Sequence, residues 1–151
     1  MAVVEREDPL ARMPRELAVG TRHPELRYAL VPDLVATRAG DGPAIVQARG
    51  STGDSDVVPV YRREPGGEMV VPTGRVLVVF ADGERADGRQ TELARAGYNV
   101  EQVLPYAPHA AWVRATNSDL ADALGNVDQL ARLHGVENVE PQMLGDLSRR
   151  F

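Results

Sequence analysis

The sequence predicts an α+β fold, in which residues 71–151 form a β-α-β-β-α-β domain and residues 1–70 form a β-rich N-terminal arm. Residues 75–80 are a continuous β-branched and apolar run, which is typical of a central strand. Residues 119–133 repeat apolar side chains at helical spacing. Pro and Gly interrupt the first seventy residues so often that no long helix fits there.

The N-terminal arm is predicted to hold three short strands, at residues 27–35, 44–48 and 57–61. The second and third are separated by residues 49–54, which are mostly turn formers. The alternative for this half of the chain is a partly ordered extension.

The C-terminal part begins with the strand at residues 75–80, which ends at a turn containing Gly83. A helix is predicted over residues 84–96. Gly97 follows it, at the position where a helix end needs a positive φ angle. Gly88 weakens the first turn of this helix.

Two further strands are predicted at residues 98–104 and 110–116, because the prolines at 105 and 108 cannot continue a ladder. Asn117 and Ser118 suit the start of a second helix, which Gly135 ends.

Residues 136–140 alternate as a half-buried strand until Pro141. The resulting order is that of a ferredoxin-like fold, with both helices on one face of an antiparallel sheet.

Composition restricts the partners that the chain can bind. The 22 acidic residues exceed the 17 basic ones, all Arg, and this excludes nucleic acid and an anionic membrane as main partners. Without Cys there is no disulfide, thiolate nucleophile or Cys-ligated zinc. No cofactor is predicted. Charges near Met1 stand where a secretory signal needs its apolar run, so a cytoplasmic location is expected.

Four stretches of the C-terminal half form a recognisable succession: Arg75-Val76-Leu77-Val78-Val79-Phe80, Ala96-Gly97-Tyr98, Leu104-Pro105-Tyr106-Ala107-Pro108-His109-Ala110-Ala111, and Leu133-His134-Gly135-Val136-Glu137-Asn138-Val139-Glu140-Pro141. Together they resemble the propeptide domain of subtilisin-like serine proteases, the I9 inhibitor family. The closing stretch is the most specific. The resemblance covers residues 73–141, and the arm has no equivalent in it.

The resemblance implies a partner, a subtilisin-like serine protease, bound in cis or in trans. Domains of this family pack an open sheet face against two surface helices of the protease, and their C-terminal tail runs through the active-site cleft. They act as folding chaperones when attached and as inhibitors afterwards. Here the tail would be residues 142–151. A stand-alone inhibitor and the N-terminal piece of a longer precursor both remain open.

The tail allows two registers in such a cleft. Subtilisin-like clefts favour apolar side chains at the first and fourth positions before the scissile bond, and Leu144 and Leu147 have that spacing. The alternative places Phe151 in the first pocket and Ser148 in the fourth. The Leu144/Leu147 register uses both apolar anchors and is preferred.

The third strand offers the contact residues of the sheet face. Alternation puts Trp112 and Arg114 on one face and small residues on the other. Trp112 is either a core anchor or an exposed contact residue. Tyr106, in the preceding turn, is the third residue expected to face the protease. This turn lacks the acid that family members often carry there.

Catalysis is not expected, because His23, His109 and His134 lie far apart and outside any metal-ligand spacing. Acid pairs such as Asp119/Asp122 are predicted to be solvated charges. The alternatives to a protease inhibitor are a non-inhibitory assembly module, and a ferredoxin-like enzyme or regulatory domain, which requires a pocket with convergent polar groups. The oligomeric state is left open.

Overall fold

The computed structural model describes residues 12–37, 44–48, 57–64, 67–145 and 147–149. These residues form nine strands: β1 (Glu16–Gly20), β2 (His23–Thr37), β3 (Ala44–Ala48), β4 (Val57–Glu64), β5 (Met69–Phe80), β6 (Tyr98–Leu104), β7 (Ala107–Ala115), β8 (Val136–Leu144) and β9 (Leu147–Arg149). The helices are the 3-10 helix η1 (Ala86–Arg89) and the α-helices α1 (Gln90–Arg95), α2 (Leu120–Gly125) and α3 (Val127–Ala131). No helix of the described chain is long and apolar enough to cross a membrane.

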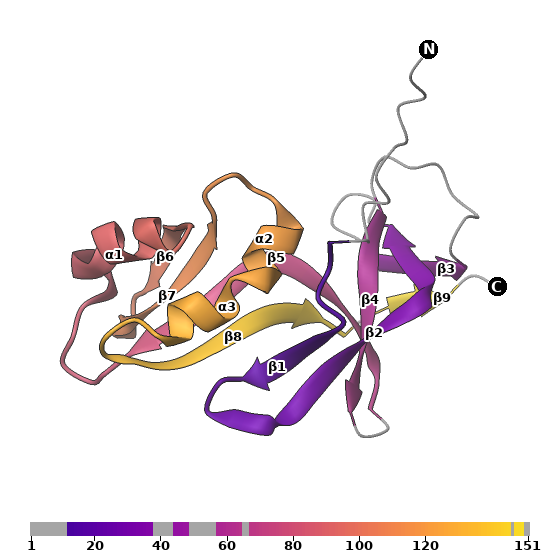
Figure 1. Cartoon of the computed structure of the whole chain (residues 1–151), viewed down its shortest axis with the longest axis horizontal. Helices are drawn as coiled ribbons and strands as arrows, with labels where there is room; N and C mark the ends of the chain where they lie inside the picture. The colour runs from indigo at the N-terminus through magenta and orange to yellow at the C-terminus, as the bar shows by residue number, and fades with distance from the viewer. Residues whose placement is uncertain (1–11, 38–43, 49–56, 65–66, 146, 150–151) are drawn as a thin grey trace, which may run out of the picture.

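The predicted ferredoxin-like α+β class is wrong. The described residues are mostly antiparallel sheet with short helices, and the sheet curls into a half-barrel. Its hydrogen-bonded order is β6-β7-β5-β4-β2-β3-β9, with β1 added beside β2 and β8 beside β5. Figure 1 shows the three α-helices over the part formed by β5 to β8, whereas β3, β4 and β9 extend beyond them.

The helices are shorter than predicted, and this is one physical reason for the wrong class. The first predicted helix is split into η1 and α1, and Gly88 lies in the 3-10 part. The second is split into α2 and α3 at Asn126, directly after Gly125. A Gly inside a helix costs roughly 1 kcal/mol relative to Ala, so each predicted helix is weakest where it is broken.

Strand β5 is the second reason, because it belongs to both halves of the sheet. Its first residues pair with β4, as Met69 with Arg62, and its later residues pair with β7 and β8. Gly74 has a φ angle of 94°, and the β5–β8 register shifts around it. The domain boundary predicted at residue 70 therefore lies inside a continuous strand.

Three apolar clusters hold the sheet together. The largest lies between the helices and the sheet and includes Phe80, Leu93 and Leu130, each with no exposed surface. A second cluster around Val46 and Val60 lies in the part formed by β2 to β5. The third joins the two parts, because Tyr61 of β4 and Leu124 of α2 both belong to it.

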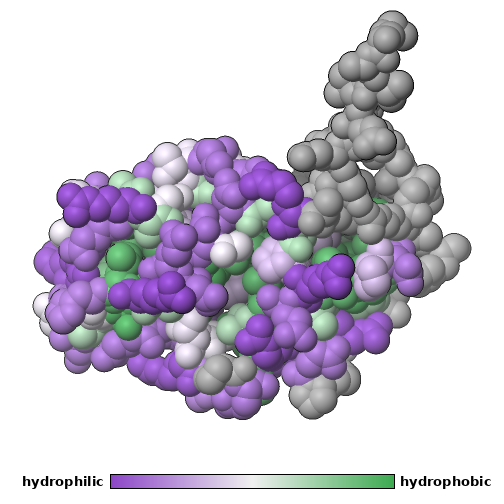
Figure 2. Space-filling model, viewed as in Figure 1, coloured by the Kyte–Doolittle hydropathy of each residue, from purple (hydrophilic) through white to green (hydrophobic). Residues whose placement is uncertain are grey.

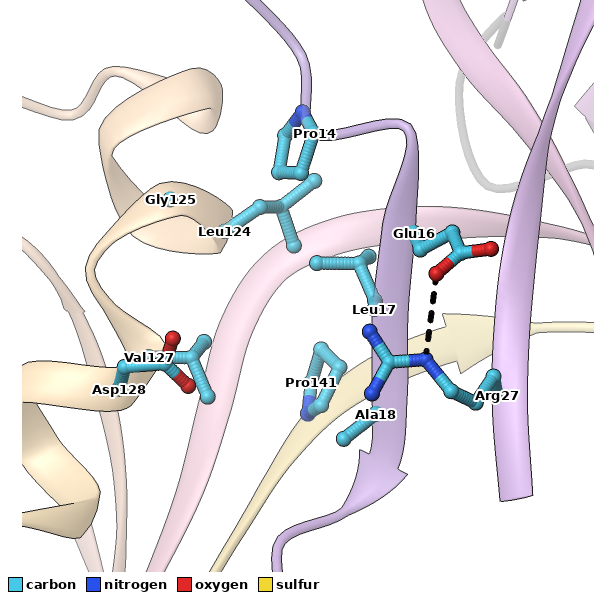
Figure 3. A pocket seen from close by; sticks show the side chains of 10 residues that line it. All are labelled: Pro14, Glu16, Leu17, Ala18, Arg27, Leu124, Gly125, Val127, Asp128 and Pro141. Atoms are coloured by element: carbon cyan, nitrogen blue, oxygen red, sulfur yellow. Dashed lines mark ion pairs between the residues drawn. The ribbon is translucent and has the colours of Figure 1, made fainter. Parts of the chain in front are cut away.

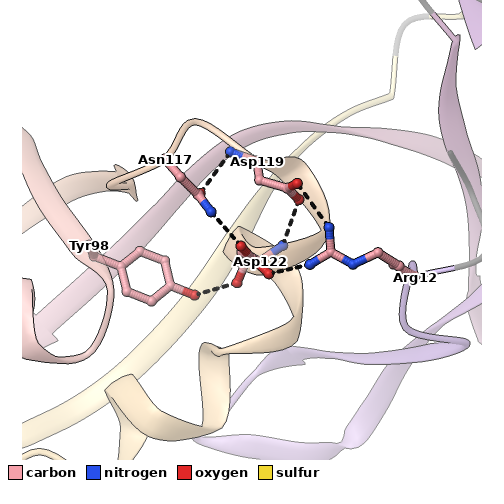
Figure 4. A network of polar contacts seen from close by, with 5 residues as sticks. All are labelled: Arg12, Tyr98, Asn117, Asp119 and Asp122. Atoms are coloured by element: carbon pink, nitrogen blue, oxygen red, sulfur yellow. Dashed lines mark hydrogen bonds and ion pairs between the residues drawn. The ribbon is translucent and has the colours of Figure 1, made fainter.

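The N-terminal segment is tied to the helical side (Figure 4). The Arg12 guanidinium donates to the carboxylates of Asp119, at 3.1 Å, and Asp122, at 2.7 Å. Asp119 caps α2 by accepting from the Asp122 N–H. This hydrogen bond and, secondarily, the Arg12 charge hold the pKa of Asp119 below its usual value. Tyr98 donates its hydroxyl to a carbonyl of α2, and burial raises its pKa.

Two strands have their predicted bounds, five are longer or shifted, and β9 lies where no strand is predicted. β3 and β6 begin and end where the sequence predicts. β8 continues through Pro141 to Leu144 instead of stopping at the proline. The main-chain N–H and the Oγ1 of Thr21, just after β1, bond the main chain of Val139 in β8.

Candidate protein-binding surface

The alternation along β7 separates two faces, as predicted. Ala111 and Val113 are fully buried against the helices, and Ala115 is buried with them. Trp112 and Arg114 point to the other side, where Trp112 is half-buried and Arg114 is exposed. Trp112 is therefore absent from the core between helices and sheet.

We call the side of the β5–β8 sheet that faces away from the helices the open face. Trp112 is paired across the sheet with Leu77 of β5 and with Gln102 of β6. Leu77 is paired in turn with Glu140 of β8. Because directly opposed residues of an antiparallel sheet share a face, these four side chains form one row across the open face. Leu77 is half-buried, and so is Val79, two residues further along β5.

A charged network orients Trp112. The Arg75 guanidinium lies 4.8 Å from the centre of the Trp112 ring, within cation-π range. Arg75 also lies 3.4 Å from a carboxylate oxygen of Glu101 and donates to Gln102 at 3.3 Å. Arg114 forms a second ion pair with Glu101. The open face thus has an apolar centre beside a charged rim in which Glu101 pairs with both Arg75 and Arg114.

Tyr106 stands at one end of this sheet, in the turn between β6 and β7. Its side chain is 83% exposed, and it is the exposed large hydrophobic residue of the described chain. Prolines precede it directly and follow it by two residues. Because proline fixes its φ angle, the turn presents Tyr106 with little conformational freedom to lose on binding.

The predicted tail anchors lie elsewhere. Leu144 ends β8 and is paired with Val71 of β5, and the hydroxyl of Thr73 donates to the nearby Gln142 side chain at 2.7 Å. Leu147 belongs to β9 and is paired with Ala44 of β3. β9 lies far from the β6–β7 end of the molecule (Figure 1). Phe151 is outside the described residues.

Two cavities accompany the helices. The first, of about 180 Å³, lies between β1, β8 and the helices α2 and α3 (Figure 3). The Arg27 guanidinium reaches into it, 3.6 Å from a carboxylate oxygen of Glu16, and Asp128 lies on the opposite wall. The second, of about 170 Å³, includes Gly74 and Ser118. Each is lined by both acidic and basic side chains.

The histidines and acids show no catalytic grouping in the described ranges. His109 lies in β7, His23 is 3.4 Å from Glu25, and the His134 carbonyl accepts from Arg89. These same ranges contain no group of three or more side chains able to hold a metal ion. The side that carries the helices is mainly hydrophilic, with small separate hydrophobic areas (Figure 2).

Sequence reasoning identified Trp112 and Arg114 but missed Arg75, Leu77 and Gln102. The continuous apolar run at 75–80 predicts a central strand and does not distinguish its two faces. Its alternate members differ, because Val76 and Val78 are fully buried and Leu77 is half-exposed. The side of Leu77 depends on its register with Trp112, which no local pattern specifies.

Comparisons of the chain with protein-family models, with curated proteins and with solved structures found no match.

Proposed function

We propose that this protein binds a subtilisin-like serine protease through the open face and the Tyr106 turn, and inhibits it or assists its folding with the C-terminal segment. The observation that carries the proposal is the Arg75–Trp112 stack beside Leu77, on the sheet face away from all three helices. Trp112 and Leu77 are both absent from the apolar cluster that packs under the helices.

The composition of this surface suits protein recognition. Trp, Tyr and Arg are the residue types that contribute most to binding at protein interfaces, and Trp112, Tyr106 and Arg114 supply one of each. Arg75 already stacks on Trp112, so the ring is oriented before a partner arrives. A protease–inhibitor interface is expected to bury on the order of 1,600 Å² in total.

The choice of partner comes from the motif resemblance. The closing stretch Gly-Val-Glu-Asn-Val-Glu-Pro occupies residues 135–141, lies in β8 from Val136 onward, and includes Glu140 of the open face. The residues after it complete β8 up to Leu144 and lead to β9, so the C-terminal segment continues directly from a strand of the open face. An extended segment gains main-chain hydrogen bonds in a cleft, and its alternate side chains fill pockets.

A second function is a non-inhibitory assembly module, which binds a partner by the same face. One observation favours it. The C-terminal segment is already paired, through Leu144 with Val71 and through Leu147 with Ala44, so it is not presented as a free tail. An assembly module needs no such tail.

The two functions are separated by titrating the chain into a subtilisin-type protease while hydrolysis of a chromogenic peptide is followed. The matched variant ends at Gly145, which removes β9 and keeps all of β8. Gln129→Ala, an exposed change on the helical side, is the control.

Inhibition by the intact chain and by Gln129→Ala, lost on truncation, supports the inhibitor. Binding without slowed hydrolysis supports the assembly module. A chain that is only digested, with no binding measured to a protease lacking its nucleophile, contradicts both.

A further inference from the structure

The C-terminal segment has a binding site within its own chain. After β8 ends at Leu144 and the exposed Gly145 follows, residues 147–149 form β9 parallel to β3. The opposed positions are Ala44 with Leu147, Ile45 with Ser148 and Val46 with Arg149. β9 is the last strand of the sheet order, and β3 is its hydrogen-bonded neighbour among the described strands.

This pairing and the proposed inhibition use the same residues. Leu147 is the anchor expected in the first specificity pocket of the protease, and its main chain is the part that would pair with the cleft. A protease cleft surrounds the segment that it binds. In the free protein β3 already occupies one hydrogen-bonding edge of β9. The segment therefore cannot lie on β3 and in the cleft at the same time.

We infer that the C-terminal segment exchanges partners, leaving β3 when a docked protease offers its cleft. This inference rests on the proposed function. β9 suits the exchange, because it contributes only three residue pairs and the pairing is parallel, the slightly weaker arrangement. Leu144, the anchor expected in the fourth pocket, is the last residue of β8 opposite Val71, so it must leave that partner together with β9.

The exchange has two consequences that can be measured. The β3 pairing holds a fraction of molecules in a form that cannot fill the cleft, so the apparent inhibition constant rises by the inverse of the competent fraction. When the segment leaves, one edge of β3 loses its hydrogen-bonded neighbour. Locking β9 onto β3 should weaken inhibition, and removing β9 should deprotect the β3 amides.

The lock is a disulfide between Ile45→Cys and Ser148→Cys, two directly opposed positions. Neighbouring strands are roughly 4.8 Å apart, which lies within the Cα separations that disulfides span. The chain has no other Cys, so the bridge is unambiguous. Its formation is verified by mass spectrometry, and each single-Cys variant is the control.

The oxidised double variant should inhibit a subtilisin-type protease at least about tenfold more weakly than its reduced form, which should match the intact chain. Equal inhibition by the oxidised and reduced forms overturns the exchange and leaves the proposed inhibition standing. Failure of the bridge to form also overturns it, because the two positions would not be neighbours. Absence of inhibition by the intact chain overturns the proposed function, and the exchange with it.

Hydrogen exchange tests the β3 site without a protease. In the intact chain, amides of residues 44–48 should exchange more slowly than in the chain ending at Gly145, whereas β6 amides should exchange alike in both. Equal exchange of the β3 amides in the two chains contradicts a β9 strand held by β3.

Discussion

The two faces of β5 and β7 differ in what their side chains do, although they alternate along the same strands. On the helical face Val76, Val78 and Val113 have no exposed surface. On the open face Trp112 remains partly exposed and is held by Arg75 instead of by the core. Neighbouring residues of one strand therefore have different roles: those on the helical face stabilise the fold, and those on the open face are available for binding.

The largest expected effect is on the helical face. Leu130→Ala removes a fully buried side chain of α3 from the core under the sheet. The free energy of unfolding should fall by about 2–5 kcal/mol, because the cavity adds to the lost burial. Urea unfolding followed by the fluorescence of Trp112, the single Trp, measures it. Unchanged stability would contradict the assignment of α3 to the core.

The next effect is on binding. Tyr106→Ser removes the 83% exposed ring from the β6–β7 turn. The dissociation constant for a subtilisin-type protease should rise about tenfold, as for a moderate interface contact. The free energy of unfolding should change by less than about 0.5 kcal/mol. An unaltered dissociation constant would show that the β6–β7 turn is not part of the binding surface.

A smaller effect concerns the start of α2. Asp119→Ala removes the cap that accepts from the Asp122 N–H and should cost about 1 kcal/mol of unfolding free energy. Asp119→Asn is the matched control, because Asn caps helices about as well as Asp but carries no charge toward Arg12. Thermal unfolding of the three proteins at pH 7 should rank them wild type, Asn, Ala.

The same residue predicts a pH dependence. The pKa of Asp119 is lower in the folded protein, chiefly through the Asp122 N–H. Its charged form therefore stabilises the fold above the unfolded pKa of about 3.9, and this stabilisation is lost as the pH falls through the lowered value. The wild type should lose its advantage over Asp119→Asn in that acidic range. If the difference in unfolding free energy between the wild type and Asp119→Asn stayed constant from pH 7 to pH 2, the charge of Asp119 would not be the source of that difference.

The smallest effect is expected at the rim of the open face. Glu101→Gln removes the carboxylate that pairs with Arg75 and Arg114. Pairs this exposed contribute little, so the unfolding free energy should change by less than about 1 kcal/mol in urea titrations. A larger loss would mean that the charged network, and not only the core, stabilises the sheet.

Local patterns predicted the strands better than their assembly. β6 has its predicted bounds, and the outward side of Trp112 follows from alternation along β7. The sequence predicts a strand end at Pro141, yet β8 passes through it. Proline removes only one donor and is tolerated on strands with an unpaired side.

What the sequence could not supply is long-range pairing. The wrong fold class arose because β5 pairs with β4 as well as with β7 and β8, which joins the predicted arm to the predicted domain. The stack of Arg75 on Trp112 and the pairing of β9 with β3 likewise join residues distant in sequence. No periodicity encodes such contacts, since each depends on strand register.

The most direct test compares two neighbours in β7, Trp112→Ala on the open face and Val113→Ala on the helical face, by calorimetric titration into a subtilisin-type protease that lacks its nucleophile. The folded Val113→Ala protein should bind with the wild-type dissociation constant, and Trp112→Ala should bind at least about tenfold more weakly. Equal binding by wild type and Trp112→Ala, or no binding by wild type, would contradict the open face as the binding surface.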